Sequence, residues 1–120
     1  MDRKESEHAT QMKTLDWYKF LYDIKTDRNG YSDSIMGSET DKCFICGNTD
    51  TTSLVRHELY RGADRQKSKL FGLWVSVCPT HHELFHTKEY EREYHRVGQV
   101  AFMQHWKKAD FIEIFGRNYL

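Results

Sequence analysis

The sequence is poor in cysteine and has no surplus of charge. Its three cysteines are an odd number, which argues against a disulfide framework and favours reduced thiols in a cytoplasmic protein. Lysine and arginine balance aspartate and glutamate at 18 residues each, so a nucleic-acid-binding surface would have to be local. No apolar run is long enough to cross a membrane, and we expect neither a signal peptide nor a membrane partner.

The remaining composition is that of a folded protein. The 120 residues suit one domain with a modest core, and 38% hydrophobic with 30% charged residues argues against disorder. We find no internal repeat and no low-complexity tract, which argues against repeat architectures. Aromatic residues make up 14% of the chain and gather near its C-terminal end.

All three cysteines lie in two short motifs. Cys43 and Cys46 are separated by two residues, and so are Cys78 and His81. Zinc prefers four ligands in a tetrahedron and accepts thiolates and imidazoles, so the two pairs together predict a structural Cys3His zinc site. The alternative is three buried structural cysteines and a surface histidine.

Two further histidines follow the second motif. His82 and His86 are four residues apart and would face the same way on a helix that begins at Pro79. His57 lies on a predicted strand directly after the first motif, and the three imidazoles could converge on a second, divalent ion. Such ligands favour zinc, nickel or manganese over magnesium. The alternative for His82 and His86 is a solvated helix face.

The pattern of apolar residues predicts an α+β fold. An amphipathic helix is expected in an N-terminal extension, residues 1–30, and strands are expected at 54–60 and 73–77. A later helix over 89–108 would present Tyr90, Tyr94, Val97 and Ala101 on one face, and Asp110 would cap a short last helix. The aromatic C-terminal region is expected to pack as core, through Phe102, Trp106, Phe111, Ile112, Ile114, Phe115, Tyr119 and Leu120.

A basic stretch connects the two predicted strands. It is too long for a tight turn, and we expect it to form a loop whose cations track a phosphodiester backbone. The candidate phosphate-binding residues are Arg61, Arg65 and Lys67, and the planar fork of Arg65 suits two phosphate oxygens. The alternative is a solvated loop, and nothing in this stretch predicts base-specific recognition.

Several of these segments together resemble a known family. The chain is similar to the HNH, or ββα-metal, nuclease superfamily, and more closely to small recombination-nuclease-like proteins of phages and prophages. The resemblance covers about residue 34 to the C-terminus and leaves residues 1–30 outside. It implies a domain over 31–120 in which a β-hairpin and a helix surround a catalytic metal beside a structural zinc, and that nicks or cleaves DNA. The segments that carry it are Arg56-His57-Glu58-Leu59-Tyr60, residues 62–68, residues 72–75, Cys78 to His86 and residues 115–120.

Matched position by position, the sequence departs from the superfamily pattern in two places. His82 replaces the central asparagine, as in colicin-type nucleases. His57 takes the ligand position and Glu58 the general-base position, although a carboxylate needs a raised pKa or a metal-bound water to act as base at neutral pH. The alternative is that His57 is the base and that only His82 and His86 bind the metal.

The sequence thus predicts a metal-dependent DNA endonuclease of HNH type with catalytic residues His57, Glu58 and His82. Its cofactors would be a structural zinc and a catalytic zinc, nickel, manganese or magnesium ion, with no small-molecule cofactor. DNA and recombination or replication proteins would be its partners. The alternative is a non-catalytic, zinc-stabilised module that binds DNA or protein. A redox zinc protein is disfavoured because no cysteine remains to react.

Overall fold

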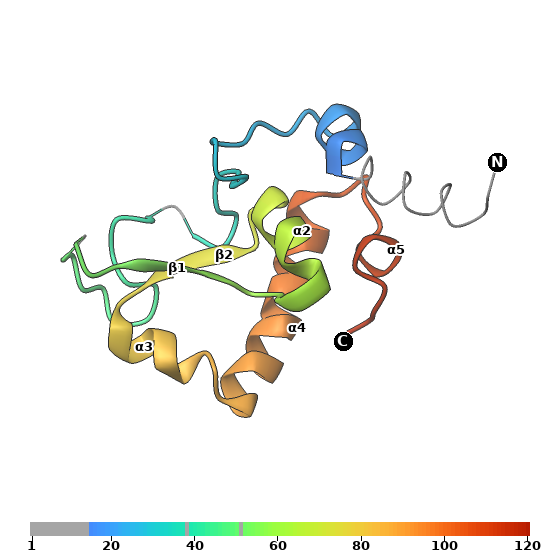
Figure 1. Ribbon diagram of the computed structural model, residues 1–120. Helices are drawn as coiled ribbons and strands as arrows, with labels where there is room; N and C mark the ends of the chain where they lie inside the picture. Colours follow the sequence, from blue (N-terminus) through green and yellow to red (C-terminus); the bar gives the residue numbers. More distant parts are fainter. Residues whose placement is uncertain (1–14, 38, 51) are drawn as a thin grey trace.

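The computed structural model describes residues 15–37, 39–50 and 52–120 of the chain (Figure 1). It confirms a small α+β fold with a two-stranded sheet. Residues 15–21 are helical. The later elements are β1 (Val55–Glu58), η1 (Gly62–Asp64), α2 (Arg65–Leu70), β2 (Trp74–Val77), α3 (Pro79–Leu84), α4 (Lys88–His105) and α5 (Phe111–Phe115).

The two strands are antiparallel and carry the centre of the molecule. His57 pairs with Val75, and Glu58 pairs with Trp74. Because successive strand residues point to opposite faces, the buried side chains of His57 and Glu58 lie on opposite sides of β1. In the view of Figure 1, α3 lies below the hairpin, and α4 runs behind α2 at the end of the hairpin.

The connection between the strands is a helix, so the loop predicted for this stretch is wrong. Leu70 and Ser68 of α2 are buried, which gives this polar segment an inward side. The Ser68 hydroxyl donates a hydrogen bond to the Leu73 carbonyl at 2.6 Å and accepts one from the Tyr60 amide at 3.2 Å. These two bonds fasten α2 to the ends of both strands.

The long helix α4 exists as predicted, but its buried face is different. It packs through Gly98, Gln99 and Phe102, while Val97 is 39% exposed. A side chain at position 98 would have its Cβ 2.7 Å from the Tyr60 hydroxyl oxygen, so only glycine permits this close approach. The C-terminal half of α4 therefore meets the core one position further along than predicted, whereas Tyr94 of the predicted face packs against Phe85 with the ring centroids 4.8 Å apart.

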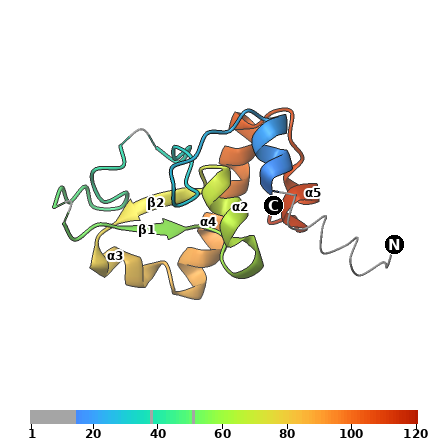
Figure 2. The same cartoon turned by 45° about the horizontal axis from the view of Figure 1, so that its top comes forward.

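The N-terminal helix docks through its tyrosines and not through its most apolar residues. Trp17, Phe20 and Leu21 are 55%, 79% and 49% exposed. Instead Tyr18 and Tyr22 pack against Phe71, with ring centroids 5.5 and 6.1 Å apart. Figure 2 shows this blue helix beside the end of α4 and α5. The first 14 residues of the predicted extension lie outside the described residues.

The predicted aromatic core is largely present. Phe71 contacts Phe102 and Phe115, and α5 is capped by the Asp110 carboxylate, which accepts a hydrogen bond from the Glu113 amide at 3.2 Å. Ile112 and Leu120 were expected to be buried but are 47% and 55% exposed. Among the described residues, no helix has the length and apolar character needed to cross a membrane.

Candidate metal centres

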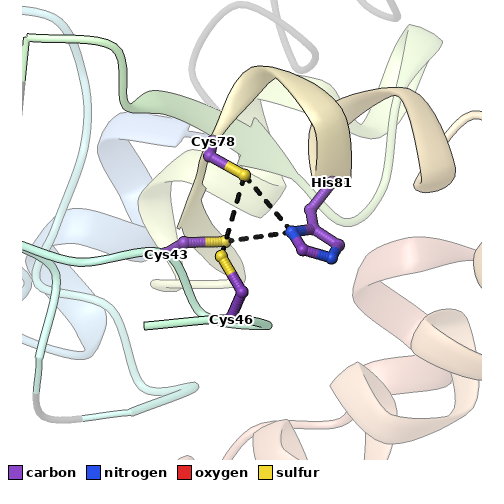
Figure 3. Close-up of side chains that lie close together, drawn as sticks. All are labelled: Cys43, Cys46, Cys78 and His81. Atoms are coloured by element: carbon purple, nitrogen blue, oxygen red, sulfur yellow. Dashed lines mark hydrogen bonds between the residues drawn. The ribbon is translucent and has the colours of Figure 1, made fainter. Parts of the chain in front are cut away.

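The four side chains of the predicted Cys3His site are close enough to bind one metal ion, which confirms that part of the prediction (Figure 3). The His81 Nδ1 atom lies 3.2 Å from the Cys78 sulfur and 3.7 Å from the Cys43 sulfur. The Cys46 and Cys78 sulfurs are 3.9 Å apart. A tetrahedral zinc ion with Zn–S bonds near 2.3 Å places its sulfurs about 3.8 Å apart, so the donor set fits zinc.

The backbone around the cysteines explains why they meet. Gly47 has a φ of 75°, which lets the chain turn so that its amide donates to the Cys43 carbonyl at 2.8 Å. The Phe44 amide donates to the Ser76 carbonyl and so fastens this turn to β2. Burial raises the pKa of the Cys43 thiol, but backbone N–H groups around it outweigh burial and lower the pKa to about 6. The thiolate form of Cys43, which is the form that binds metal, is therefore populated at neutral pH.

A second group of metal-binding side chains lies next to the first. It consists of His57 on β1, His82 on α3 and His86, and we call it the imidazole cluster. One nitrogen from each ring lies within 4.8 Å of the others. The ring centroids are 5.5 Å apart for His57 and His82, and 4.8 Å apart for His82 and His86. The structure thus brings together three predicted site residues from separate segments.

The position of His86 differs from the prediction, because α3 ends at Leu84 and does not carry His86 on its last turn. The chain nevertheless keeps turning after the helix. The Phe85 amide donates to the His81 carbonyl at 3.2 Å, and the His86 amide donates to the Glu83 carbonyl at 3.0 Å. This extra turn keeps His86 beside His82.

The environment of His57 favours the neutral imidazole. The residue is 5% exposed, and its ring centroid lies 4.7 Å from that of Phe85. Burial, followed by positive charge on His82 and His86, lowers the pKa of His57 to about 4. Burial, then His86, also lowers the pKa of His82. Neutral rings are the form that binds metal, so His57 and His82 are in the metal-binding form at neutral pH.

Glu58 is a buried carboxylate, with 7% of its surface exposed. Its Oε1 atom accepts hydrogen bonds from the Tyr31 hydroxyl at 2.5 Å and from Arg65 Nε at 3.2 Å. Burial raises the pKa of Glu58, but Tyr31, the backbone N–H of Glu58 itself and Arg65 together outweigh burial and leave the pKa below its ordinary value. A general base would need the opposite shift, and the carboxylate is held on the other side of β1 from the imidazole cluster.

The predicted phosphate-binding cations have different surroundings. Arg61 lies at the cluster, where its guanidinium donates to His86 Nδ1 at 2.7 Å and to Glu91 at 3.3 Å. Arg65 is anchored by Glu58 through Nε, so its terminal nitrogens stay available. Lys67 does not face the site, because its ammonium donates to the Ile114 carbonyl at 2.7 Å and holds α5.

The contact between Arg61 and His86 competes with metal binding. A neutral imidazole that accepts at Nδ1 carries its proton on Nε2, so neither nitrogen has a free lone pair. A metal at Nδ1 would displace Arg61 directly. A metal at Nε2 would move the proton to Nδ1, which could then no longer accept a hydrogen bond from Arg61. Whichever nitrogen ligates, Arg61 must leave His86 first.

Sequence reasoning missed two residues of this region. Tyr31 stands in a stretch interpreted as a connector, and its hydrogen bond to Glu58 spans 27 positions. Glu91 is one of several glutamates at the start of α4, and only its contacts with Arg61 and His95 distinguish it. Neither residue belongs to a local pattern, so no sequence signal marked them.

We expect Tyr31→Phe to destabilise the protein by about 1–3 kcal/mol at neutral pH, because a buried carboxylate loses a donor. The depressed pKa of Glu58 stabilises the fold above the ordinary glutamate pKa, and this contribution is lost as the pH falls through the folded value. The variant raises the folded pKa, so its deficit should shrink in acid. Urea unfolding at pH 7 and pH 4 measures this, with Tyr90→Phe as control. An equal deficit at both pH values would contradict it.

Comparison with protein-family models, curated proteins and solved structures found no match in any of the three.

Proposed function

We propose that the protein is a metal-dependent DNA endonuclease of the HNH, or ββα-metal, type. Zinc in the Cys3His site would hold the start of α3 against the turn before β1. A second divalent ion would be held by the imidazole cluster. The observation that carries the proposal is that three imidazoles from separate segments gather beside the thiolate site within 4.8 Å of one another.

The environment of the cluster supports this assignment. His57 is 5% exposed, and its ring lies against that of Phe85 with the centroids 4.7 Å apart. His82 and His86 face the same space, so the three neutral rings leave a bound ion its full double charge.

The chemistry follows from the residues around the cluster. When bound, the cation would lower the pKa of a nucleophilic water, polarise the phosphodiester and stabilise the leaving oxyanion. The closeness of all three nitrogens favours His57 as a ligand over His57 as the base. Ionised Glu58 orients Arg65, whose free terminal nitrogens could bind a phosphate oxygen. Arg61, once displaced from His86, would lie beside the phosphate at the imidazole cluster, whereas Arg65 would bind a phosphate on the other side of β1.

The proposal is tested by nicking of supercoiled plasmid with zinc, nickel, manganese or magnesium added to the zinc-loaded protein. Cleavage that needs one of these ions and is lost in His57→Ala and His82→Ala supports it. Absence of cleavage with every ion, or cleavage that both variants retain, rejects it.

The competition at His86 gives a separate prediction. Arg61→Ala should bind a divalent ion at the imidazole cluster several-fold more tightly, because the variant lacks both the competing hydrogen bond and a nearby positive charge. Cobalt or manganese titration of zinc-loaded protein measures the affinity. Arg65→Ala is the matched control, since Arg65 pairs with Glu58 instead of His86. Unchanged or weaker binding in Arg61→Ala would show that the contact does not oppose the metal.

The same contact supports a second candidate, a non-catalytic zinc-stabilised module that binds DNA or protein. An arginine bound to His86 and a glutamate with a lowered pKa would both suit a cluster that never holds a second ion. One zinc per chain, unaffected by His82→Ala and His86→Ala, would favour this module over the enzyme.

A further inference from the structure

A hollow surface adjoins the imidazole cluster on the side of Arg61. A cavity of about 390 Å³ is lined by Arg61, Glu91, Arg117 and Tyr119 among others. A second cavity of about 410 Å³ shares Glu91, Arg117 and Tyr119 with the first and continues over Arg96. Since the two cavities share residues, they form one surface that starts one side chain away from His86.

The buried side-chain amide of Gln99 holds the C-terminal tail in place at this surface. Gln99 of α4 is 2% exposed. Its Nε2 atom donates to the Asn118 side-chain oxygen at 3.0 Å, and its Oε1 atom accepts from the Tyr119 amide at 2.7 Å. These bonds hold the tail on α4 and place the Arg117 guanidinium 5.1 Å from the centre of the Tyr119 ring. Arg117 is thus presented by an ordered backbone.

The surface carries uncompensated positive charge. Lys88, Arg92, Arg96 and Arg117 line its second cavity, and none of them forms an ion pair with a carboxylate of the described residues. Glu91 is the one acidic residue that lines the second cavity. Its carboxylate is already paired with Arg61 and lies near His95. In a chain with zero net charge, these four unpaired cations stand close together.

The arrangement of the cations is costly for the helix that carries three of them. Lys88, Arg92 and Arg96 recur every fourth residue, so they share one face of α4 at intervals of about 6 Å. Like charges at this spacing repel one another, and Glu89 and Glu91 in the first turn of α4 offset only part of this charge. A polyanion lying along this face would relieve the remaining repulsion.

We propose that Lys88, Arg92, Arg96 and Arg117, which we call the arginine surface, bind the sugar–phosphate backbone of DNA next to the phosphate that is cleaved. This inference rests on the proposed endonuclease function. Arg61 connects the two places, because it contacts His86 and lines the same cavity as Arg117. The substrate is therefore a polynucleotide, recognised through phosphates without base-specific contacts.

The position of this surface differs from the phosphate track predicted along residues 61–69. Lys67 holds α5, and the Lys69 ammonium lies 4.6 Å from the centre of the Tyr31 ring, on the other side of the molecule's hairpin from the imidazole cluster. Of the predicted track, Arg61 alone adjoins the arginine surface, because it lines the same cavity as Arg117. The DNA path inferred from the structure thus follows α4 and the C-terminal tail.

The test is the affinity of the zinc-loaded protein for a short labelled duplex, measured over a range of salt concentrations with no other divalent ion present. Arg117→Ala should bind several-fold more weakly for any sequence, and its salt slope should fall by about 0.9 for the one lost phosphate contact. Arg117→Lys keeps the charge and should retain most of the affinity, which separates loss of charge from damage to the tail. Arg28→Ala, an exposed arginine that lines neither cavity, is the control.

The outcomes separate this inference from the proposed function. Unchanged affinity and slope in Arg117→Ala and in Arg92→Ala/Arg96→Ala would overturn the arginine surface, even if plasmid is nicked in a His82-dependent way. A fall in affinity with both Arg117→Ala and Arg117→Lys would also overturn it, because the effect would then not follow charge. Weaker DNA binding in Arg117→Ala but not in Arg117→Lys would establish the arginine surface. If the wild-type protein at the same time nicks no plasmid, the endonuclease is rejected.

Discussion

Cys78→Ser is expected to unfold the protein. Cys78 stands between β2 and α3, and its sulfur is close to both Cys46 and His81, so its loss removes the ligand that ties the two motifs together. Zinc binding to small structural sites is worth on the order of 10 kcal/mol at neutral pH, which matches the whole stability of a typical domain. We therefore expect a disordered far-UV circular dichroism spectrum and no bound zinc.

The reason for this large effect lies in the size of the elements that meet at the site. β1 and β2 are each four residues long, and α3 has six. A two-stranded hairpin is marginal by itself and needs another element to pack against. A chelator should reproduce the effect on the wild-type protein, and added zinc should reverse it. A Cys78→Ser variant that melts cooperatively at the wild-type temperature would contradict a structural role for the metal.

His82→Ala is expected to abolish DNA nicking while the fold and the thiolate zinc remain. A bound cation contributes several kcal/mol to stabilising charge in the transition state, so its loss should slow cleavage by roughly 10³-fold or more. His82 lies on α3 one position after the zinc ligand His81, but its ring turns away toward His57 and His86. The measurement is the single-turnover nicking rate together with the melting temperature.

A matched control is available within the chain. His105 is an exposed histidine at the end of α4 and belongs to neither metal centre, so His105→Ala should nick at the wild-type rate. His82→Ala protein that stays folded and nicks as fast as His105→Ala would exclude catalysis through the imidazole cluster.

The sequence was sufficient for the parts of the site that depend on local spacing. The two motifs of the Cys3His site, Cys43/Cys46 and Cys78/His81, fix their own ligand pairs, and the helix start at Pro79 follows from the residues beside it. His57 was found because it lies on a strand that such a zinc site would position. Each of these predictions needed only a few neighbouring residues.

The contacts that modify the site could not be predicted in this way. The hydrogen bond from Tyr31 to Glu58 and that from Arg61 to His86 join segments 27 and 25 positions apart. Lys67 looked like a phosphate ligand because it is basic and polar neighbours surround it. Only the packing of α5 shows that its ammonium binds a backbone carbonyl.

The buried sides of two helices could not be predicted correctly for a related reason. Hydrophobic periodicity assigned Val97 to the inward side of α4, because a valine is usually more buried than a glycine. The close approach of Tyr60 to Gly98 turns that side chain outward. At the N-terminal helix, Trp17 and Phe20 are more apolar than Tyr18, but the space beside Phe71 accepts the tyrosine.

The most direct test of the account is the number of metal ions bound per chain, measured by native mass spectrometry and elemental analysis. Wild-type protein loaded with zinc should carry two ions, and His82→Ala/His86→Ala protein should carry one while it stays folded. One ion in both proteins would mean that the three imidazoles hold no cation, and the hydrolytic function would have to be abandoned.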